Sequence, residues 1–322
     1  MAFVSIVGSC FNEAGNVGEL VQRIGQVFAK LPEHTYEIVL ADNGSTDGTD
    51  EELRKLAQEN PHVRVILNAR NFGHIRSPTH AMLQARGDAV INMATDLEDP
   101  PELIADLIAE WQKGAKVVAA VKRKTSDSWA LTVARRIFYG IIGRISEVRL
   151  IPNFTGFGLY DRVVVERVRL IDDPYPYMRG LISEIGFPPK LVQFDKPPRK
   201  RGITKHNFLT LYDFAMLGIV KHSVAPLRLA TLCALVLSVF SLFVGLGYLV
   251  AKLMWWDQFQ LGLAPLLIGV FFFSSVQLFF IGMLGEYVNS IHTHVRRLPL
   301  VTERERLNFK EDAGGRAPGK GD

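Results

Sequence analysis

Residues Ile91–Glu102 read INMATDLEDPPE. A short apolar strand runs into a turn with three acids, Asp96, Glu98 and Asp99, and Pro100–Pro101 then suits the first turn of a helix. An acidic turn at the carboxyl end of a strand is where open α/β sheets place their ligand crevice. Carboxylates in such a turn can hold a divalent metal against a diphosphate. The stretch therefore predicts an α/β sheet with an acidic, ligand-binding edge.

The chain on either side of this stretch alternates between apolar strand-like runs and helical patterns. Strands are expected over Phe3–Ser9, Tyr36–Ala41, Val63–Leu67, Ala89–Met93, Lys116–Val121, Asn153–Tyr160 and Lys190–Phe194. Helices are expected between most of them, for example over Val17–Lys30 and Glu102–Lys113. The alternation predicts a largely parallel sheet with helices on both faces, in which the strand near residue 190 is the last.

Two long apolar runs follow this α/β part. Leu229–Ala251 and Gln258–Gly285 contain no charged residue, and each exceeds the roughly 20 residues needed to cross a bilayer. His206–His222 has apolar side chains at helical spacing, which suits a helix lying along a membrane surface. We expect an α/β domain over 1–205, a membrane-surface helix over 206–226, two transmembrane helices over 227–286, and a C-terminal helix with a disordered tail over 287–322.

Charge around the two apolar runs predicts their orientation. Lysines and arginines gather before the first run and after the second, whereas the hairpin between them offers only Lys252 and Asp257. The positive-inside rule then places both termini and the α/β domain in the cytoplasm. The start, MAFVSIVGSCFNE, lacks a basic leader and reads as a strand. Cys10 and Cys233 are the two cysteines, and their separation implies no disulfide framework.

Several motifs occur together in a characteristic order: CFNEAGNV, ADNGSTDGT, the NFGH loop and TDLEDPP, and then RKRGITKHNF before two apolar spans. This ordered set resembles the family 2 glycosyltransferases of the GT-A fold. The last pattern narrows the resemblance to the polyprenyl-phosphate glycosyltransferases, such as bactoprenol glucosyltransferase and dolichol-phosphate mannosyltransferase. The resemblance implies transfer of a sugar, with inversion, from a UDP- or GDP-sugar to the phosphate of a polyprenyl lipid.

The resemblance also assigns roles to residues of the early motifs. Glu13 and Asp42 match acids that contact the nucleotide, and Asn43 and Arg70 belong to the same expected donor site. On its local sequence alone, Asp42 is better explained as a turn acid that starts a helix, and Arg70 as a solvated loop residue. The complete motif set favours the nucleotide for Asp42.

Asp96 corresponds to the final acid of the family's Asp-x-Asp element, which holds Mg²⁺ or Mn²⁺ on the donor diphosphate. The first acid of that element is Ala94 here, and the second acid of the usual Asp-Asp-Gly-Ser is Asn43. One protein carboxylate, Asp96, would then hold a metal that the diphosphate and water complete, so we expect weak metal binding without donor. Asp99 and Glu102 are interpreted as helix-start residues.

A further departure lies in NFTGFGLYD, where many relatives carry an acid and this chain has Gly156. Such an acid could act as a general base toward a hydroxyl acceptor. A phosphate monoester has a second pKa of about 6 and is already an anionic nucleophile at neutral pH. The missing acid is therefore consistent with a phosphate acceptor.

The basic loop before the first span supplies the expected counter-charge for that acceptor. Arg199 and Lys205 match the family's Arg-x-x-Gly-x-Ser-Lys element and are expected to bind the lipid phosphate, so they join Asp96 as catalytic candidates. The alternative is that such residues only set topology or contact anionic lipid.

Two rival functions remain open on the sequence. A processive polysaccharide synthase shares the early motifs but normally carries a Gln-x-x-Arg-Trp element, and no Arg-Trp pair occurs here. A catalytically silent membrane scaffold would explain Ala94 and Gly156, but the other motif acids and bases are retained. The basic residues gather beside the spans and not over one soluble face, which argues against nucleic acid. Relatives form oligomers, so the resemblance implies a homo-oligomer, with a tetramer as the expected form.

Overall fold

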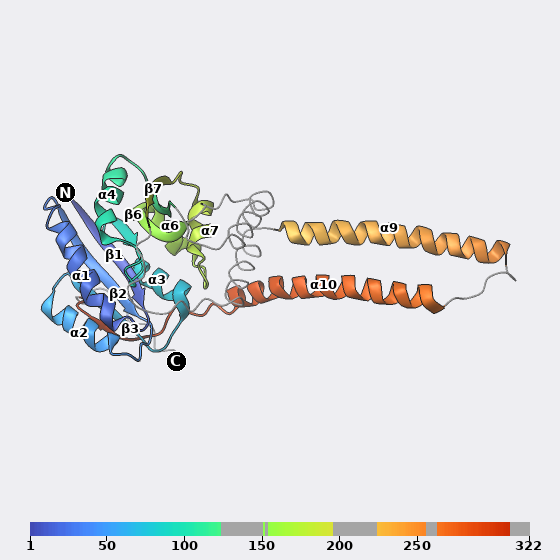
Figure 1. The fold of residues 1–322 in the computed structure, drawn as a ribbon, viewed down its shortest axis with the longest axis horizontal. Coiled ribbons are helices and arrows are strands. Elements are labelled where there is room, and N and C mark those ends of the chain that lie inside the picture. The colour runs from blue at the N-terminus through green and yellow to red at the C-terminus, as the bar shows by residue number, and fades with distance from the viewer. Residues whose placement is uncertain (124–150, 152–153, 196–223, 256–262, 310–322) are drawn as a thin grey trace, which may run out of the picture. The chain divides into compact units, whose positions relative to one another are not determined.

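The structure is a computed structural model that describes residues 1–123, 151, 154–195, 224–255 and 263–309. Its contacts divide the chain into two compact units, one containing the sheet and the other containing the two long helices (Figure 1). Within the described residues, one sheet of eight strands runs in the order β7-β5-β6-β4-β1-β2-β3-β8.

The strands follow the expected positions closely. They are β1 (Ala2–Cys10), β2 (His34–Asp42), β3 (Val63–Asn68), β4 (Ala89–Asn92), β5 (Val117–Lys122), β6 (Phe154–Asp161), β7 (Lys190–Phe194) and β8 (Glu303–Leu307). The helices are α1 (Ala14–Phe28), α2 (Thr49–Glu59), α3 (Gly73–Gln84), the 3₁₀ turn η1 (Pro101–Leu103), α4 (Ile104–Gln112), α6 (Arg162–Ile171), α7 (Met178–Ile185), α9 (Ala225–Met254) and α10 (Leu263–Val295).

The centre of the sheet is parallel, as predicted. β4, β1, β2 and β3 run in the same direction, and β5 and β7 form a second parallel pair. β6 is antiparallel to both β4 and β5, and β8 is antiparallel to β3. The prediction that Lys190–Phe194 is the last strand was wrong, because β8 follows it in the chain and begins at Glu303.

Alternating side chains of the central strands fill two hydrophobic cores. In β2, Ile38 and Leu40 pack on the face covered by α1, α2 and α4. Val39 and Ala41 pack on the opposite face, which α3, α6 and α7 cover. Burial on both faces explains why these strands read as continuous apolar runs, and it confirms the expected helices on both sides of the sheet.

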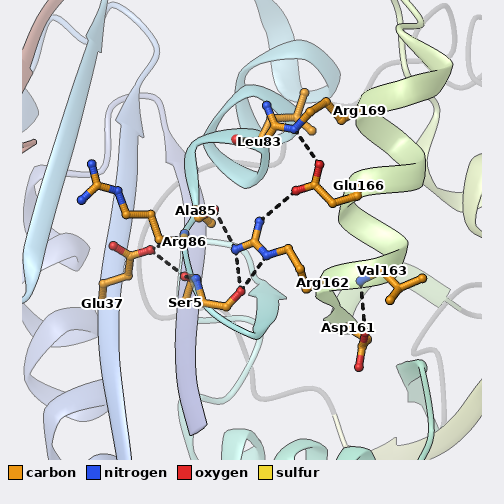
Figure 2. A network of polar contacts seen from close by, with 11 residues as sticks. Ser5, Glu37, Leu83, Ala85, Arg86, Asp161, Arg162, Val163, Glu166 and Arg169 are labelled. Atoms are coloured by element: carbon orange, nitrogen blue, oxygen red, sulfur yellow. Dashed lines mark hydrogen bonds and ion pairs between the residues drawn. The ribbon is translucent and has the colours of Figure 1, made fainter. Parts of the chain in front are cut away.

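A polar network fixes the edge of the sheet at which the parallel strands begin. Arg162 donates to the carbonyl oxygens of Ala85 and Gly87, each at 2.9 Å, in the turn between α3 and β4, and Figure 2 shows its guanidinium beside Ala85 and Glu166. In the same network the buried carboxylate of Glu37 accepts a 2.6 Å hydrogen bond from Ser5 Oγ. These hydrogen bonds fix the position of the start of β4. The acidic loop begins at the other end of this strand, so the point from which it leaves the sheet is also fixed.

The second unit contains α9, of 30 residues, and α10, of 33 residues. Pro226–Met254 and Ile268–Val295 are long and apolar enough to cross a membrane, with mean hydropathies of 2.5 and 1.9. The side chains described on them are mostly exposed, for example Leu242 and Phe271, each at 70%. Length and composition therefore fit the two expected spans.

Residues 287–309 contain the expected helical continuation and, in addition, a strand that was not expected. α10 continues to Val295, and Glu303–Leu307 then forms the edge strand β8 of the catalytic sheet. Glutamate and arginine alternate in this strand. It therefore lacks the apolar periodicity from which a strand is predicted. The expected membrane-surface helix over 206–222 and the tail from 310 onward lie outside the described residues.

Candidate active site

The candidate site lies where the parallel strands β1, β2, β3 and β4 end. Because they run in the same direction, the loops after them meet at one edge of the sheet. These loops are residues 11–13, 43–48, 69–72 and 93–100. They carry the four motifs of the early sequence.

Asp42 ends β2 and is fully buried. Its carboxylate accepts hydrogen bonds from the backbone N–H groups of Gly44 at 3.1 Å and Ser45 at 3.2 Å, and from Ser45 Oγ at 2.5 Å. Gly44 has φ of +74°, and a Cβ there would lie 2.9 Å from the backbone of Arg70. Asp42 therefore stabilises a tight turn, which is the role that its local sequence predicted. Its buried carboxylate lies at the edge of the sheet where the parallel strands end.

Hydrogen bonds join the loop after β1 to the loop after β2. The backbone N–H of Glu13 donates to Thr49 Oγ1 at 2.9 Å, and that of Asn12 donates to Ser45 Oγ at 2.9 Å. Asn12 itself has φ of +61°, a conformation that asparagine tolerates better than most residues. The side chain of Glu13 is partly buried and accepts from Asn16 Nδ2. The two loops form one unit, so Glu13 and Asp42 occupy fixed positions.

The pKa of Cys10 indicates that the end of β1 lies in a negatively charged environment. Burial raises the pKa of the Cys10 thiol well above its ordinary value, and the charges of Asp42, Glu13 and Asp47 raise that pKa further. Three carboxylates therefore converge on the end of β1. A concentration of negative charge suits a ligand that offers hydrogen-bond donors or a bound cation, and repels an unaccompanied phosphate.

Asn43 connects the loop after β2 to the loop after β3. Its side chain is buried; Nδ2 donates to Asn71 Oδ1 at 2.9 Å and to Gly73 O at 3.2 Å, and Oδ1 accepts from the backbone N–H of Phe72 at 2.9 Å. Both amide hydrogens are thus used within the protein. The position that usually carries an acid therefore holds the loop after β3 in place, and its contact with a donor stays a prediction.

Arg70 lies in the loop that Asn43 holds. Its guanidinium stacks over the ring of Phe72, with 4.2 Å from Cζ to the ring centroid, and Nη1 donates to Asn71 O at 3.1 Å. The residue is exposed. The loop is rigidly connected, and its arginine is oriented at the same edge as the three acids. Its contact with a donor stays a prediction.

The stretch 93–100 forms an irregular loop after β4. The backbone N–H of Met93 donates to Val7 O at 3.0 Å, and Thr95 Oγ1 donates to Ser9 O at 3.1 Å. A Cβ on Gly8 would lie 2.8 Å from Thr95 Cγ2, so the end of β1 and this loop are in close contact. Sequence reasoning overlooked Thr95; its position between Ala94 and Asp96 in a strand-end turn was the available signal.

Asp96 is half-buried in this loop, and its Oδ1 accepts from the backbone N–H of Glu98 at 3.1 Å. The next residue, Leu97, has φ of +64°. A left-handed conformation costs roughly 1–2 kcal/mol for a residue with a side chain. Such strain occurs most often where a loop must keep one shape for function, and here it adjoins the predicted metal ligand.

Asp99 and Glu102 have structural roles, but only one of them as expected. Asp99 is buried and its Oδ2 accepts from the backbone N–H of Ala94 at 2.9 Å, which closes the loop instead of capping a helix. Burial raises the pKa of Asp99 to about 6, against the lowering effects of the Ala94 N–H and Lys122. Glu102 is exposed and pairs with Arg23 at 2.6 Å, away from the loop.

Gly156 in β6 faces this loop through Asn92. Its carbonyl oxygen accepts from Asn92 Nδ2 at 3.0 Å and from Tyr160 OH at 2.9 Å, and its φ is +99°. An acid at this position would strain the backbone. Gly158 lies nearby, where a Cβ would be 2.4 Å from Val118 O, so the backbones of β6 and β5 approach closely at this glycine.

The described residues do not test every candidate. Arg199 and Lys205, expected to bind the acceptor phosphate, lie outside them. Among the residues that the structure describes, no group of three or more histidine, cysteine, aspartate or glutamate side chains could hold a metal. A single carboxylate at Asp96, beside the buried Asp99, fits a metal only if diphosphate oxygens complete the coordination.

Comparison with known proteins identifies the family. The model of glycosyl transferase family 2 matches residues 5–169. The chain belongs to glycosyl transferase family 2. The matched residues run from β1 into α6 and include all four loops of the candidate site. The chain is therefore a glycosyltransferase, and its sheet covered by helices on both faces agrees with the α/β fold expected from its motifs.

Relatives of this glycosyltransferase match almost its whole length. An uncharacterized glycosyltransferase of Synechocystis sp. is 34% identical over 298 residues, 92% of this chain and 93% of that protein. The bactoprenol glucosyl transferase of Shigella phage SfII is 32% identical over 297 residues, 92% of this chain and 96% of that protein. Among solved structures, mannosyl-3-phosphoglycerate synthase from Rubrobacter xylanophilus is similar with a TM-score of 0.46 and 18% identity, covering 68% of this chain and 72% of that one.

Proposed function

We propose that this glycosyltransferase moves one sugar from a UDP- or GDP-sugar to polyprenyl phosphate at the cytoplasmic face of a bacterial inner membrane. The observation that carries the proposal is the likeness to bactoprenol glucosyl transferases over 92% of the chain, a length that includes both apolar helices as well as the sheet. A glycosyltransferase domain joined to two apolar helices is suited to an acceptor that lies in a membrane, such as a lipid phosphate.

The proposed reaction is a single displacement. An oxygen of the lipid phosphate forms a bond to the anomeric carbon, the bond from that carbon to the donor's diphosphate oxygen breaks, and the nucleoside diphosphate leaves with the electron pair. Inversion at the anomeric carbon follows from a single in-line step. Positioning and electrostatic stabilisation are the main contributions left to the protein.

Residues of the site divide between donor and acceptor in this proposal. Glu13 and Asp42 contact the base and ribose, and Arg70 lies beside the diphosphate. Arg199 and Lys205 bind the acceptor phosphate. Gly156 offers no general base, and none is needed for an anionic phosphate nucleophile.

Asp96 is the proposed protein ligand of Mg²⁺ or Mn²⁺. Such a metal, when bound with the diphosphate, neutralises charge on the leaving group. Because the described loop offers one suitable carboxylate, we expect tight Mn²⁺ binding only in the presence of UDP or GDP. Calorimetric titration with Mn²⁺, with and without nucleotide, measures this; tight binding to the nucleotide-free protein would contradict it.

The function is tested with membranes containing the protein, undecaprenyl phosphate, and a panel of labelled UDP- and GDP-sugars. We expect one nucleotide sugar to label the lipid with a single sugar, and Lys205→Ala to weaken use of lipid phosphate without weakening nucleotide binding. A polymeric product would favour the processive synthase, and nucleotide binding without transfer would favour the silent scaffold. Efficient labelling of a hydroxyl acceptor, but not of polyprenyl phosphate, would reject the proposed acceptor.

A further inference from the structure

The edge of the sheet beside the candidate site is completed by the end of the chain. β8 pairs antiparallel with β3, with Val65 opposite Leu307 and Leu67 opposite Glu305. The register shifts between Leu67 and Asn68, where β3 runs into the loop of residues 69–72. The C-terminal strand therefore covers β3 up to the point at which the donor-site loop begins.

The contact continues into the loop itself. The backbone N–H of Ala69 donates to Thr302 O at 2.9 Å. On the other side of the loop, Glu303 contacts His80 of α3, the helix that the loop enters. Both side chains are largely buried, at 15% and 18% exposure. The loop is thus held from one side by Asn43 and from the other by the segment 302–303.

Further contacts anchor β8 and the residues after it to α2 and to the start of β3. Arg54 donates to both carboxylate oxygens of Glu305, at 2.8 and 2.7 Å. Asn308 Nδ2 donates to Val63 O at 2.8 Å, and the guanidinium of Arg64 stacks over Phe309 with 3.9 Å to the ring centroid. Single exposed ion pairs contribute little, but a paired strand with several such contacts has one register. The register determines where Thr302 and Glu303 lie.

We propose that β8 is a positioning element for the donor-site loop 69–72, so that the affinity for the nucleotide sugar depends on a strand that follows the second apolar helix. Only residues 296–302 separate the end of α10 from β8. The chain therefore links its candidate membrane span directly to the loop that carries Arg70. This inference rests on the proposed donor site.

Two truncations test the proposal. Ending the chain after Pro299 removes β8, whereas ending it after Phe309 keeps β8 and serves as the matched control. We expect the first truncation to raise the KM for the nucleotide sugar about tenfold or more and to leave kcat at saturating donor within about twofold, with the KM for lipid phosphate unchanged. The control should match the full chain.

A single substitution keeps the test valid if the shorter truncation does not fold. Glu303→Ala removes the contact with His80, and we expect a threefold or larger increase in donor KM. Lys113→Ala is its control, because Lys113 forms a comparable ion pair with Glu110 at 2.8 Å on an exposed surface far from the loop in the sequence. A general loss of folded enzyme would lower the apparent kcat and leave the donor KM unchanged. An increase in donor KM alone therefore indicates a displaced loop and not a smaller amount of folded protein.

Hydrogen exchange supplies a readout that does not need activity. The amides of Ala69 and Phe72 donate to Thr302 O and Asn43 Oδ1, and we expect both to exchange faster in Glu303→Ala while amides of β1 and β2 do not. Unchanged donor KM with unchanged exchange would overturn the proposal. If the unaltered protein bound no nucleotide sugar, the proposed function would fail, and the exchange result would still decide whether β8 orders the loop.

Discussion

Asp96 and Glu102 belong to the same acidic stretch and differ in their surroundings. Asp96 lies in a loop with a left-handed neighbour, Leu97, whereas Glu102 begins the turn into α4 and pairs with Arg23. The same stretch therefore contains Asp96, which we propose as a metal ligand, and Glu102, which forms an ion pair between η1 and α1. The distinction depends on which groups surround each carboxylate.

Substitution of these two acids should separate their roles. Asp96→Asn removes the charge that would hold a metal, and we expect kcat to fall roughly 10²–10³-fold, the range typical of losing one electrostatic contact to a transition state. Glu102→Gln, the control, should stay within about twofold. Initial rates with saturating donor and Mn²⁺ measure both. Equal losses in the two variants would show that Asp96 has no special role.

Gly156 illustrates a residue whose identity is imposed by the backbone. With φ of +99°, Gly156→Ala should destabilise the fold by roughly 1–2 kcal/mol, because a Cβ is strained in this region. Gly25→Ala is the control: Gly25 lies inside α1, where a Cβ makes ordinary contacts and alanine favours the helix. Chemical unfolding in detergent compares the two. A neutral Gly156→Ala would contradict the strained conformation.

At the level of elements, the loop between β3 and α3 depends on neutral amides. Asn43 donates to Asn71 Oδ1 and Gly73 O, and an aspartate would place two oxygens against those acceptors. Asn43→Asp recreates the family's usual acid, but here we expect it to raise the donor KM and to cost about 1–3 kcal/mol of stability through unsatisfied and repelling groups. Donor kinetics and unfolding measurements check this; improved activity would contradict it.

The attachment of β8 should respond to acid. Burial would raise the pKa of Glu303, but hydrogen bonds from His80 and Arg306 outweigh it and lower the pKa from 4.5 to about 2. A lowered pKa means that the carboxylate stabilises the fold fully above about pH 4.5 and loses that effect as the pH falls toward 2. We expect protease cleavage near residues 296–302 to increase between pH 4.5 and 3, measured with an acid-active protease.

The matching control is Glu303→Gln, which cannot ionise at this position. Its cleavage rate should be higher at pH 6 and should change less between pH 4.5 and 3 than that of the unaltered chain. Identical pH profiles for the two proteins would show that Glu303 does not hold the strand.

For the molecule as a whole, the two apolar helices and the charge around them predict the topology. Asp257, in the hairpin between α9 and α10, should lie outside the cytoplasm, whereas the exposed Lys113 on the catalytic unit should lie inside. In a Cys233→Ser background, a membrane-impermeant maleimide added to intact cells should label Asp257→Cys and not Lys113→Cys. The reverse labelling would invert the proposed orientation.

Much of the fold followed from local pattern. Every expected strand from Phe3–Ser9 to Lys190–Phe194 overlaps an observed one, because buried parallel strands must be continuously apolar and their helices must be amphipathic. β8 did not follow, because the alternating charges of Glu303–Leu307 pair with α2 and α3 side chains that are distant in sequence. An edge strand that is rich in charged residues shows little of the apolar periodicity from which strands are predicted.

The ordered motifs in the amino-acid sequence were enough to identify a family 2 glycosyltransferase, its acidic loops and its two apolar helices, because local composition dictates strand ends and spans. Pairing across the fold was needed to show that Asn43 holds a loop, that Asp99 closes the turn of Asp96, and that Gly156 cannot be an acid without strain. The contacts of Asn43 join residues 28 and 30 positions apart, and the contact of Gly156 with Asn92 joins residues 64 positions apart, which no local pattern contains. For the same reason only the tertiary structure shows that β8 pairs with β3 and contacts His80, 223 positions from Glu303.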